Sequence, residues 1–362
     1  MKKLWIDLRP IFFLFIAWRL ILGVIQLAAP GLFVLREGFL GPTPWVNFDG
    51  AHYLSIAGAG YRQYLEAFFP FYPLLIRWGH EITALSPEIV ALTISHVAAF
   101  VAVVFFYKLS SIHNRKISYW STVLFLFFPT SFFLVSVYPA SLYLALGAAC
   151  VWCIGKRRWW WAGILGGLAS ATHIFGVYLI IAAALEFYQS KKRRFVQDGF
   201  AIALIPMGLF MYMYYLWKSM GDPLAFFHIQ PIFGANRSGG ELIFLPQVIW
   251  RYVKILFTAN PASFSYTIAT FEFLSFAFVI YLLVRGWQQK LKFSYLMYSL
   301  AVIITPTLTG TLSSFPRYLL AVFPLFFTLE TLSGRMKVLT AIMFGLALIY
   351  FASAFLQGYF VA

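Results

Sequence analysis

The sequence has 362 residues, of which 62% are hydrophobic and only 11% are charged, and its mean hydropathy is +0.81. This composition excludes a soluble globular protein, because too few polar residues are available to cover its surface. The net charge of +15 is interpreted as a topology signal, since Lys and Arg are retained in short cytoplasmic loops, and not as a nucleic-acid-binding surface. We therefore predict an all-α, polytopic membrane protein that forms one domain over residues 1–362.

The N-terminal apolar stretch predicts a first membrane span near residues 11–29. Basic residues precede it and small residues follow it, which loosely imitates a secretory signal. The stretch is too long for a signal core, and Arg19 interrupts it. We expect an uncleaved span that starts from a cytoplasmic N-terminus.

A long segment of about residues 30–88 follows and is expected to lie outside the cytoplasm. Its turn-forming residues are Pro30, Gly31, Pro42, Pro44, Pro70 and Pro73. Because these alternate with aromatic and charged residues, the segment predicts short interfacial helices and turns instead of another span.

The remaining apolar runs complete a bundle of about eleven crossings. Single spans are predicted near residues 89–109, 119–136, 138–155, 197–217, 264–284, 293–310, 317–333 and 338–357. Residues 159–189 lie between two basic clusters and must cross an even number of times, so two shorter helices are expected to meet near His173. Most Lys and Arg residues then fall on the cytoplasmic side, and a second outer segment covers about residues 218–262.

Asp49 is the leading candidate for a catalytic residue. It stands in "NFDGAHYLSIAGAGY", residues 47–61, and is one of four aspartates in the chain. Helical spacing from Asp49 places His52, Tyr53 and Ile56 on the same face, while Gly50, Gly58 and Gly60 would allow another element to approach closely. The carboxylate is either a general base for a hydroxyl nucleophile or an N-cap of the helix, and Asn would serve only the second role.

Five arginines supply cations to the outer segments. They are Arg62, Arg77, Arg237, Arg251 and Arg317. Arginine binds phosphate through paired, charge-assisted hydrogen bonds, but it also reaches from apolar surfaces toward lipid headgroups. Arg317 is the strongest phosphate candidate, because "SSFPRYLLAVFP" places it at the start of a helix next to small polar residues.

No recognisable metal or cofactor motif accompanies these residues. Cys150 and Cys153 have C-x-x-C spacing but no companion pair, and they are interpreted as small residues of a membrane helix. His173 lies in an apolar run, where it is either a hydrogen-bonded core residue or part of a cavity. We predict a protein without a metal or a cofactor.

The chain resembles the PIG-V-like mannosyltransferases and their prokaryotic relatives. The run "NFDGAHYLSIAGAGYRQYLEAFFPFYPLLIR" carries the first signature, and "FPTSFFLVSVYPASLYLAL", "RRWWWAGILGGLASATHIFGVYL", "GDPLAFFHIQ" and "SSFPRYLLAVFPLF" follow in the expected order. Two positions depart from the family pattern. Ala140 replaces a frequent Glu, and His173 replaces a frequent Arg.

The resemblance implies a GT-C glycosyltransferase of the plasma membrane whose active site faces away from the cytoplasm. Such an enzyme takes a hexose, mannose in the named relatives, from a polyprenyl-phosphate donor and passes it to a lipid or glycan acceptor. Asp49 would be the base, and the substrate-binding candidates are His52, Tyr53, Arg62, Tyr138, Ser141, His173, Gln230, Arg237 and Arg317. The alternative from the residues alone is a lipid or solute transporter or flippase, which would leave the clustered residues of the first outer segment without a role.

Overall fold

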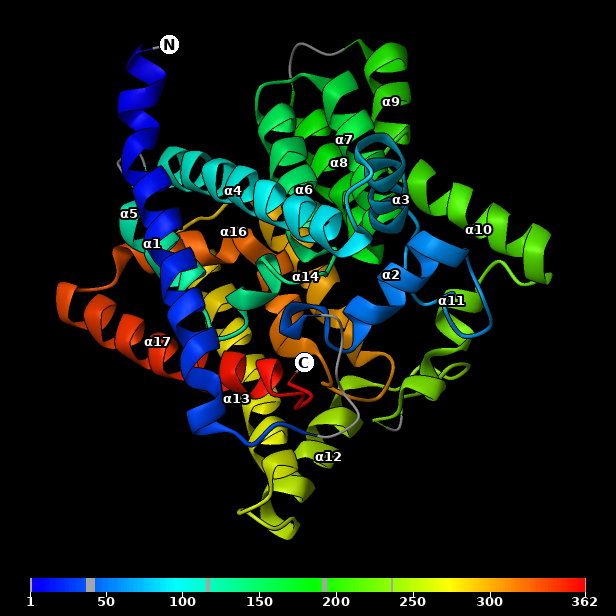
Figure 1. The fold of residues 1–362 in the computed structure, drawn as a ribbon. Coiled ribbons are helices and arrows are strands. Elements are labelled where there is room, and N and C mark those ends of the chain that lie inside the picture. The colour runs from blue at the N-terminus through cyan, green and yellow to red at the C-terminus, as the bar shows by residue number, and fades with distance from the viewer. Residues whose placement is uncertain (1, 37–42, 115–117, 191–193, 236, 362) are drawn as a thin grey trace.

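The computed structural model describes residues 2–36, 43–114, 118–190, 194–235 and 237–361, and the side chains from Leu8 onward. All regular elements in these ranges are helical, which confirms the predicted all-α class. Figure 1 shows α1 running along one side of the molecule from the N-terminus. The last helix, α17, packs across the C-terminal half of α1.

The helices are α1 (Lys2–Leu32), α2 (Asp49–Ala59), α3 (Phe71–Thr83), α4 (Pro87–Asn114), α5 (Tyr119–Leu126), α6 (Ala140–Gly155), α7 (Trp159–Thr172), α8 (Leu179–Gln189), α9 (Phe195–Ala203), α10 (Met207–Met220), α11 (Ala225–His228), α12 (Leu245–Thr258), α13 (Phe264–Gln288), α14 (Phe293–Thr307), α15 (Phe315–Tyr318), α16 (Phe323–Phe326) and α17 (Gly334–Leu356). Short 3-10 helices are η1 (Pro44–Val46), η2 (Ser131–Leu134), η3 (Ile174–Tyr178), η4 (Gln230–Phe233), η5 (Leu319–Val322) and η6 (Phe327–Thr331).

Several helices have the length and composition of membrane spans. Four qualify in the described ranges, namely Leu8–Leu32, Pro87–Asn114, Phe264–Gln288 and Gly334–Leu356. Helices α9 and α10 would form a fifth span that is bent by 47°. The chain is therefore a multi-pass membrane protein, whereas the count of eleven crossings stays a prediction.

Besides the bent α9–α10 pair, two of the predicted spans are wrong as single helices. Residues 119–136 break after α5, where Pro129 disfavours the helical conformation of the residue before it. Residues 317–333 divide into short turns of helix, and Pro324 removes a backbone donor within them. Both segments are almost completely buried. Irregular backbone at membrane depth is tolerated when protein covers it, so these runs are apolar because they face the core and not lipid.

The pair of short helices predicted in residues 159–189 is confirmed. Helix α7 ends at Thr172, His173 is extended, and η3 and α8 continue the chain. Glycines on α7 and α10 bring these helices into close contact. A Cβ at Gly208 would lie 2.1 Å from the carbonyl oxygen of Gly167, so a side chain there would force the two helices apart.

In the segment of about residues 30–88, the described part forms α2 and α3, which confirms the prediction of short helices there. The Tyr72 hydroxyl donates to Ala91 O at 3.1 Å, and Arg77 Nε donates to Ala57 O at 2.8 Å, so α3 is tied to both α4 and α2. Of the three glycines predicted to allow close approach, only Gly50 does so, because a Cβ there would lie 3.2 Å from Val137 O. A Cβ at Gly58 or Gly60 would meet no atom within 4 Å, so those two positions do not serve helix contact.

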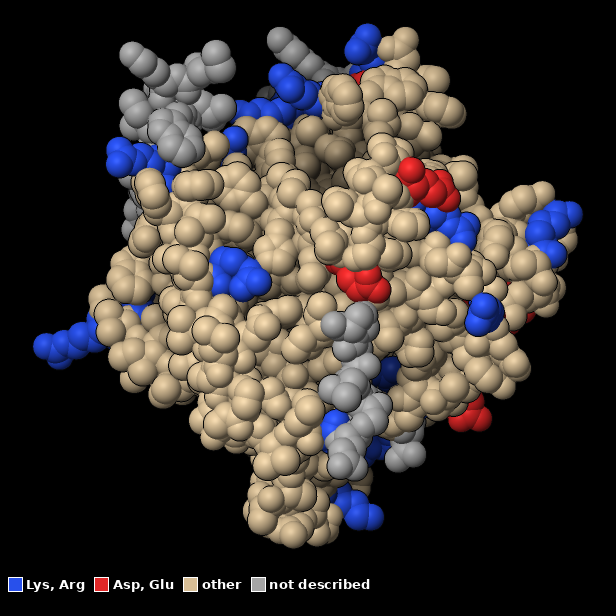
Figure 2. Space-filling view, in the orientation of Figure 1, with Lys and Arg blue, Asp and Glu red and all other residues tan. Residues whose placement is uncertain are grey.

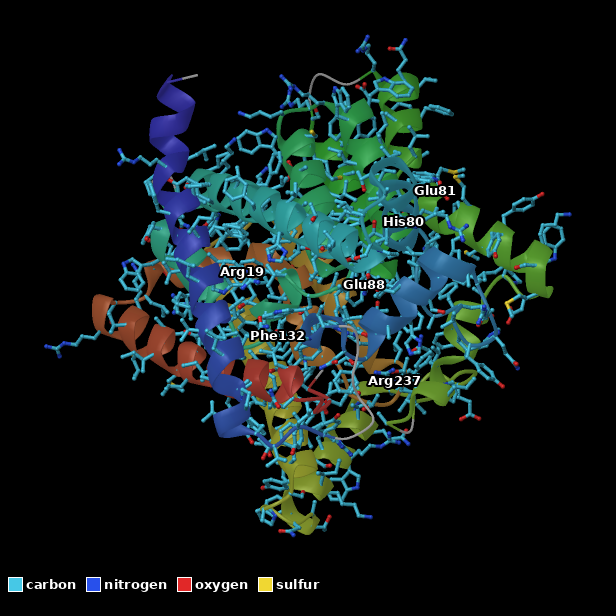
Figure 3. All side chains as sticks on the ribbon, in the orientation of Figure 1. Arg19, His80, Glu81, Glu88, Phe132 and Arg237 are labelled. Carbon is cyan, nitrogen blue, oxygen red and sulfur yellow. The ribbon has the colours of Figure 1, made fainter. Side chains whose placement is uncertain are left out.

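The surface agrees with a membrane environment. Figure 2 shows a mostly uncharged visible face, with blue Lys and Arg residues gathered near its upper edge and only scattered charged residues elsewhere. Arg19 and Glu88, labelled in Figure 3, lie near the middle of this face, and Arg19 Nε donates to His96 Nε2 at 2.8 Å. Its guanidinium also lies 5.4 Å from the centre of the Trp45 ring, so internal partners accommodate this charge.

Candidate active site

The start of α2 is fixed by contacts with distant parts of the chain. Asn47 Nδ2 donates to Phe355 O at 2.8 Å, and Val137 N donates to Trp45 O at 3.0 Å. The residue after Asn47, Phe48, has a φ of 59° and a ψ of −119°, a strained backbone conformation for a residue with a side chain. Such strain persists only where the surroundings enforce it, so the position of the next residue, Asp49, is closely defined.

Asp49 is the first residue of α2 and forms an ion pair with Arg317. Arg317 Nη1 donates to Asp49 Oδ2 at 2.7 Å, and the two side chains are 12% (Arg317) and 25% (Asp49) exposed. The helix start has no side-chain cap hydrogen bond. The capping interpretation of Asp49 is therefore not supported, because its carboxylate is directed to Arg317.

Aromatic rings surround the Arg317 guanidinium. Its Cζ lies 5.3, 5.1 and 5.4 Å from the ring centres of Phe133, Tyr138 and Tyr318. These contacts stabilise a cation and restrict its orientation. The predicted Pro-started helix is present as α15, but it is only four residues long. Arg317 is thus held mainly by its partners and not by a long helix.

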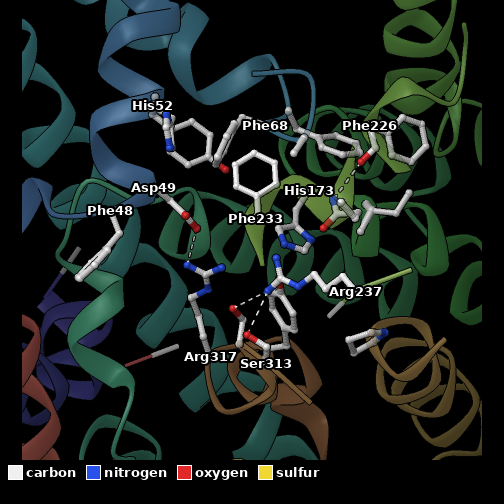
Figure 4. Close-up of a pocket in the computed structure, with 18 of the residues that line it drawn as sticks. Phe48, Asp49, His52, Phe68, His173, Phe226, Phe233, Arg237, Ser313 and Arg317 are labelled. Carbon is white, nitrogen blue, oxygen red and sulfur yellow. Dashed lines mark hydrogen bonds and ion pairs between the residues drawn. The ribbon is translucent and has the colours of Figure 1, made fainter. Parts of the chain in front are cut away.

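The Asp49–Arg317 pair lies on the wall of a cavity of about 540 Å³, within the usual size range of small-molecule sites. Figure 4 shows how the side chains surround it. The predicted residues that line it are Asp49, His52, Tyr53, His173, Gln230, Arg237 and Arg317. The tertiary fold therefore brings together seven candidates that lie up to 268 residues apart in sequence.

Much of the cavity wall is aromatic. The Phe68 ring lies 4.9 Å from the His52 ring and 5.5 Å from the Phe233 ring, measured between centres. Phe226 and Phe69 form a similar pair, 5.7 Å apart, next to His173. Aromatic faces of this kind can pack against the apolar C–H face of a sugar, while the polar groups fix its orientation.

Arg237, from the segment between α10 and α12, lines the same cavity. Its Nη2 donates to Ser313 Oγ at 3.3 Å and to Ser314 Oγ at 3.2 Å. Both serines also line the cavity. The sequence marked this region as small and polar, but it did not indicate that these hydroxyls would hold Arg237.

Both departures from the family pattern line a second, smaller cavity of about 50 Å³. Ala140 and His173 belong to its wall, together with Asp49, Tyr138 and Arg317. His173 Nδ1 accepts a hydrogen bond from Phe175 N at 3.3 Å, and its ring lies 5.9 Å from that of Tyr318. A larger side chain at position 140 would fill this smaller cavity. The residue at position 140 therefore sets the free volume next to the Asp49–Arg317 pair.

Tyr53 faces the cavity as a neutral group. Burial raises the pKa of its phenol well above the usual value, and the Asp49 carboxylate raises it further. The hydroxyl therefore keeps its proton and can donate a hydrogen bond. Tyr138 donates its own hydroxyl to Asn47 O at 3.1 Å and so supports the backbone before Asp49.

Three predicted residues lie outside the main cavity. Tyr138 lines only the smaller cavity, Arg62 is exposed, and Ser141 is fully buried in α6 with no partner for its hydroxyl oxygen among the described residues. Conversely, the sequence did not single out Phe233 or Phe226 as cavity residues. Nothing in their local pattern separates them from the many other phenylalanines of the chain.

Within the described part of the chain, no three His, Cys, Asp or Glu side chains cluster as metal ligands would. Asp49, His52 and His173 line the cavity, but they do not form such a group. The expectation that no metal takes part remains a prediction.

The fold and the site define a polytopic helical membrane protein with a carboxylate–arginine pair on the wall of a sugar-sized, aromatic cavity. Residues 34–198 match the family of mannosyltransferases described as PIG-V. This match confirms the predicted family resemblance over that part of the chain, which includes Asp49, Ala140 and His173. It supports glycosyl transfer as the activity, and Arg237 and Arg317 lie beyond the matched residues.

Two solved structures of the Archaeoglobus fulgidus oligosaccharyltransferase are also similar to this chain. The apo form has 13% sequence identity and a TM-score of 0.44, and it covers 95% of this chain. The complex with zinc and sulfate has 14% identity and a TM-score of 0.44, and it covers 94%. This chain spans only 56% and 53% of the length of those chains. The search of curated proteins found no match.

Proposed function

We propose that this protein is an inverting glycosyltransferase that moves a hexose, with mannose as the first candidate, from a polyprenyl-phosphate donor to an acceptor hydroxyl. The observation that carries the proposal is the position of the Asp49 carboxylate, oriented by Arg317 on the wall of a 540 Å³ cavity. The PIG-V match supports the sugar-transfer chemistry. The enzyme is proposed to be a GT-C glycosyltransferase of the plasma membrane.

In this mechanism Asp49 takes the proton from the acceptor hydroxyl as its oxygen attacks the anomeric carbon. The attack comes from the face opposite the phosphate, so the bond between the anomeric carbon and the phosphate oxygen breaks with inversion. The departing polyprenyl phosphate carries the bonding electron pair as an anion. Cavity cations stabilise that negative charge as it develops.

The location of the site follows from the predicted topology. With the N-terminus in the cytoplasm, Asp49 and Arg237 belong to segments on the opposite side of the membrane. A lipid-linked donor is available there, and the surrounding lipids would deliver both the donor and a lipid or glycan acceptor. The proposed active site is therefore extracytoplasmic.

The test is a transfer assay with purified protein in liposomes. Polyprenyl phosphates that carry radiolabelled mannose, glucose or galactose are supplied with a membrane lipid extract, and a water-soluble nucleotide sugar serves as the control donor. We expect label in a new glycoside of opposite anomeric configuration, with mannose preferred. Movement of the labelled lipid across the bilayer without a covalent change would instead support a flippase.

A further inference from the structure

The two arginines of the cavity differ in their partners. The charge of Arg317 is balanced by Asp49 at 2.7 Å. Arg237 contacts the hydroxyls of Ser313 and Ser314, and no ion pair joins it to a carboxylate in the described residues. Because no carboxylate of the described residues pairs with it directly, the Arg237 guanidinium can contact an anionic ligand, and Glu272 acts on its charge only from a distance.

Ser313 and Ser314 belong to a strained turn formed by residues 309–314. Ser314 has a φ of 66°, a left-handed conformation that residues with a side chain rarely adopt. The turn is held by hydrogen bonds from Leu312 N to the Tyr252 hydroxyl and from Ser313 N to Thr311 Oγ1, both at 3.1 Å. These contacts hold both serine hydroxyls toward Arg237.

A buried carboxylate supports the back of this turn. Glu272 of α13 is only 5% exposed and accepts a hydrogen bond from the Tyr252 hydroxyl at 2.6 Å. It also interacts with the backbone of Ser314 and with the charge of Arg237. An acidic residue inside a membrane helix is energetically costly and usually has a functional role. The mechanism proposed above gives Glu272 no role.

The other end of the turn is fixed as well. Ser238 N, next to Arg237, donates to Thr309 O at 2.9 Å, and Arg251 Nη1 donates to Gly310 O at 2.6 Å. Arg237 and the turn are thus held together by contacts on both sides. A site of this kind needs little rearrangement when a ligand binds.

We propose that Arg237, Ser313 and Ser314 form the phosphate-binding subsite, with Glu272 and Tyr252 as the residues that position it, and that Arg317 instead orients Asp49. This inference rests on the proposed function, since the phosphate is that of the polyprenyl donor. The guanidinium binds phosphate oxygens through charge-assisted hydrogen bonds, and the serine hydroxyls donate to the same group. Arg317 then orients the base, and Arg237 binds the phosphate.

The experiment measures binding instead of turnover. Farnesyl phosphate is the probe, farnesol is its uncharged counterpart, and the full-length protein in detergent is titrated by tryptophan fluorescence. Arg237→Gln is expected to weaken farnesyl phosphate binding at least about tenfold and to leave farnesol binding unchanged. Lys254→Gln, which removes an exposed cation of α12, is the matched control and should bind like the wild type.

The variant Asp49→Asn/Arg317→Gln removes the ion pair without changing net charge. It should bind farnesyl phosphate within about threefold of the wild type, since the subsite is intact. Glu272→Leu should weaken binding, whereas Glu272→Gln, which can still accept the Tyr252 hydrogen bond, should retain most of it. If Arg237→Gln does not fold, Ser313→Ala/Ser314→Ala is expected to show the same selective loss.

The opposite pattern would overturn the inference. Loss of phosphate binding in the Asp49→Asn/Arg317→Gln variant, with retention in Arg237→Gln, would assign the phosphate to Arg317. Equal affinity of the wild type for farnesyl phosphate and farnesol would refute the phosphate-binding subsite. It would not contradict the proposed glycosyl transfer. Selective phosphate binding without transfer in the liposome assay would keep the subsite and refute the proposed function.

Discussion

Replacing Arg317 with Gln tests the ion pair at the centre of the site. The substitution removes the guanidinium that lies 2.7 Å from Asp49 and contacts three aromatic rings. Asp49 keeps its charge but loses its partner, and the rings lose their cation. We expect both a loss of stability and a loss of transfer activity, because the carboxylate is no longer oriented.

The size of the stability loss follows from burial. Removing one member of a buried pair costs about 3–5 kcal/mol, but Asp49 is 25% exposed and cavity water can solvate it, so about 2–3 kcal/mol is expected here. Asp49→Asn should cost only about 1–2 kcal/mol, since Asn can still accept a hydrogen bond from Arg317. In the double variant two neutral amides face each other, so the losses should fall short of their sum by about 1–3 kcal/mol.

The measurement is a double-mutant cycle from equilibrium unfolding of the wild type, both single variants and the double variant in mixed micelles. Transfer activity of each variant is recorded in parallel. Stability should partly recover in the double variant while activity stays lost. Strictly additive losses of stability would show that the two residues do not interact, and the account of the site would be wrong.

Three further substitutions test the cavity and its support. Gly50→Val should cost about 1–3 kcal/mol and slow transfer because its side chain meets Val137 O, whereas Gly58→Val, which meets no atom within 4 Å, should change neither thermal unfolding nor rate. Phe233→Ala should raise KM about threefold to tenfold with little change in kcat, because an aromatic contact for the sugar is lost. The control is Phe257→Ala, which changes an exposed residue of α12. An unchanged KM in Phe233→Ala would show that Phe233 does not contact the sugar. Asp222→Asn breaks an exposed pair with His228 and should alter stability by less than about 1 kcal/mol with full activity retained. A large loss of activity would mean that the Asp222 carboxylate also takes part.

The sequence predicted the candidate base more readily than its partner. Asp49 and Arg317 each stood out, Asp49 because carboxylates are rare in this chain and Arg317 because of the Ser-Ser-Phe-Pro context. Their pairing is a tertiary contact over 268 residues, and no local pattern encodes it. As a result Arg317 was predicted to bind phosphate, whereas the ion pair favours Arg237 for that role.

Glu272 illustrates a signal that was present in the sequence. An acidic residue within the apolar run of α13 is unusual in a membrane span and indicates a buried partner. The identity of that partner, Tyr252 on α12, again required the fold. The same holds for residues 317–333, since hydropathy does not distinguish an apolar segment that faces lipid from one buried among other helices.

The central claim is that the Asp49 carboxylate removes the proton from the acceptor. The most direct measurement is the single-turnover rate of sugar transfer from the purified polyprenyl-phosphate donor, compared between the wild type, Asp49→Asn and Asp222→Asn at saturating substrate. The account predicts a loss of at least about 100-fold for Asp49→Asn, with donor binding preserved, and a wild-type rate for Asp222→Asn. Transfer by Asp49→Asn at a rate close to that of the wild type would contradict the claim.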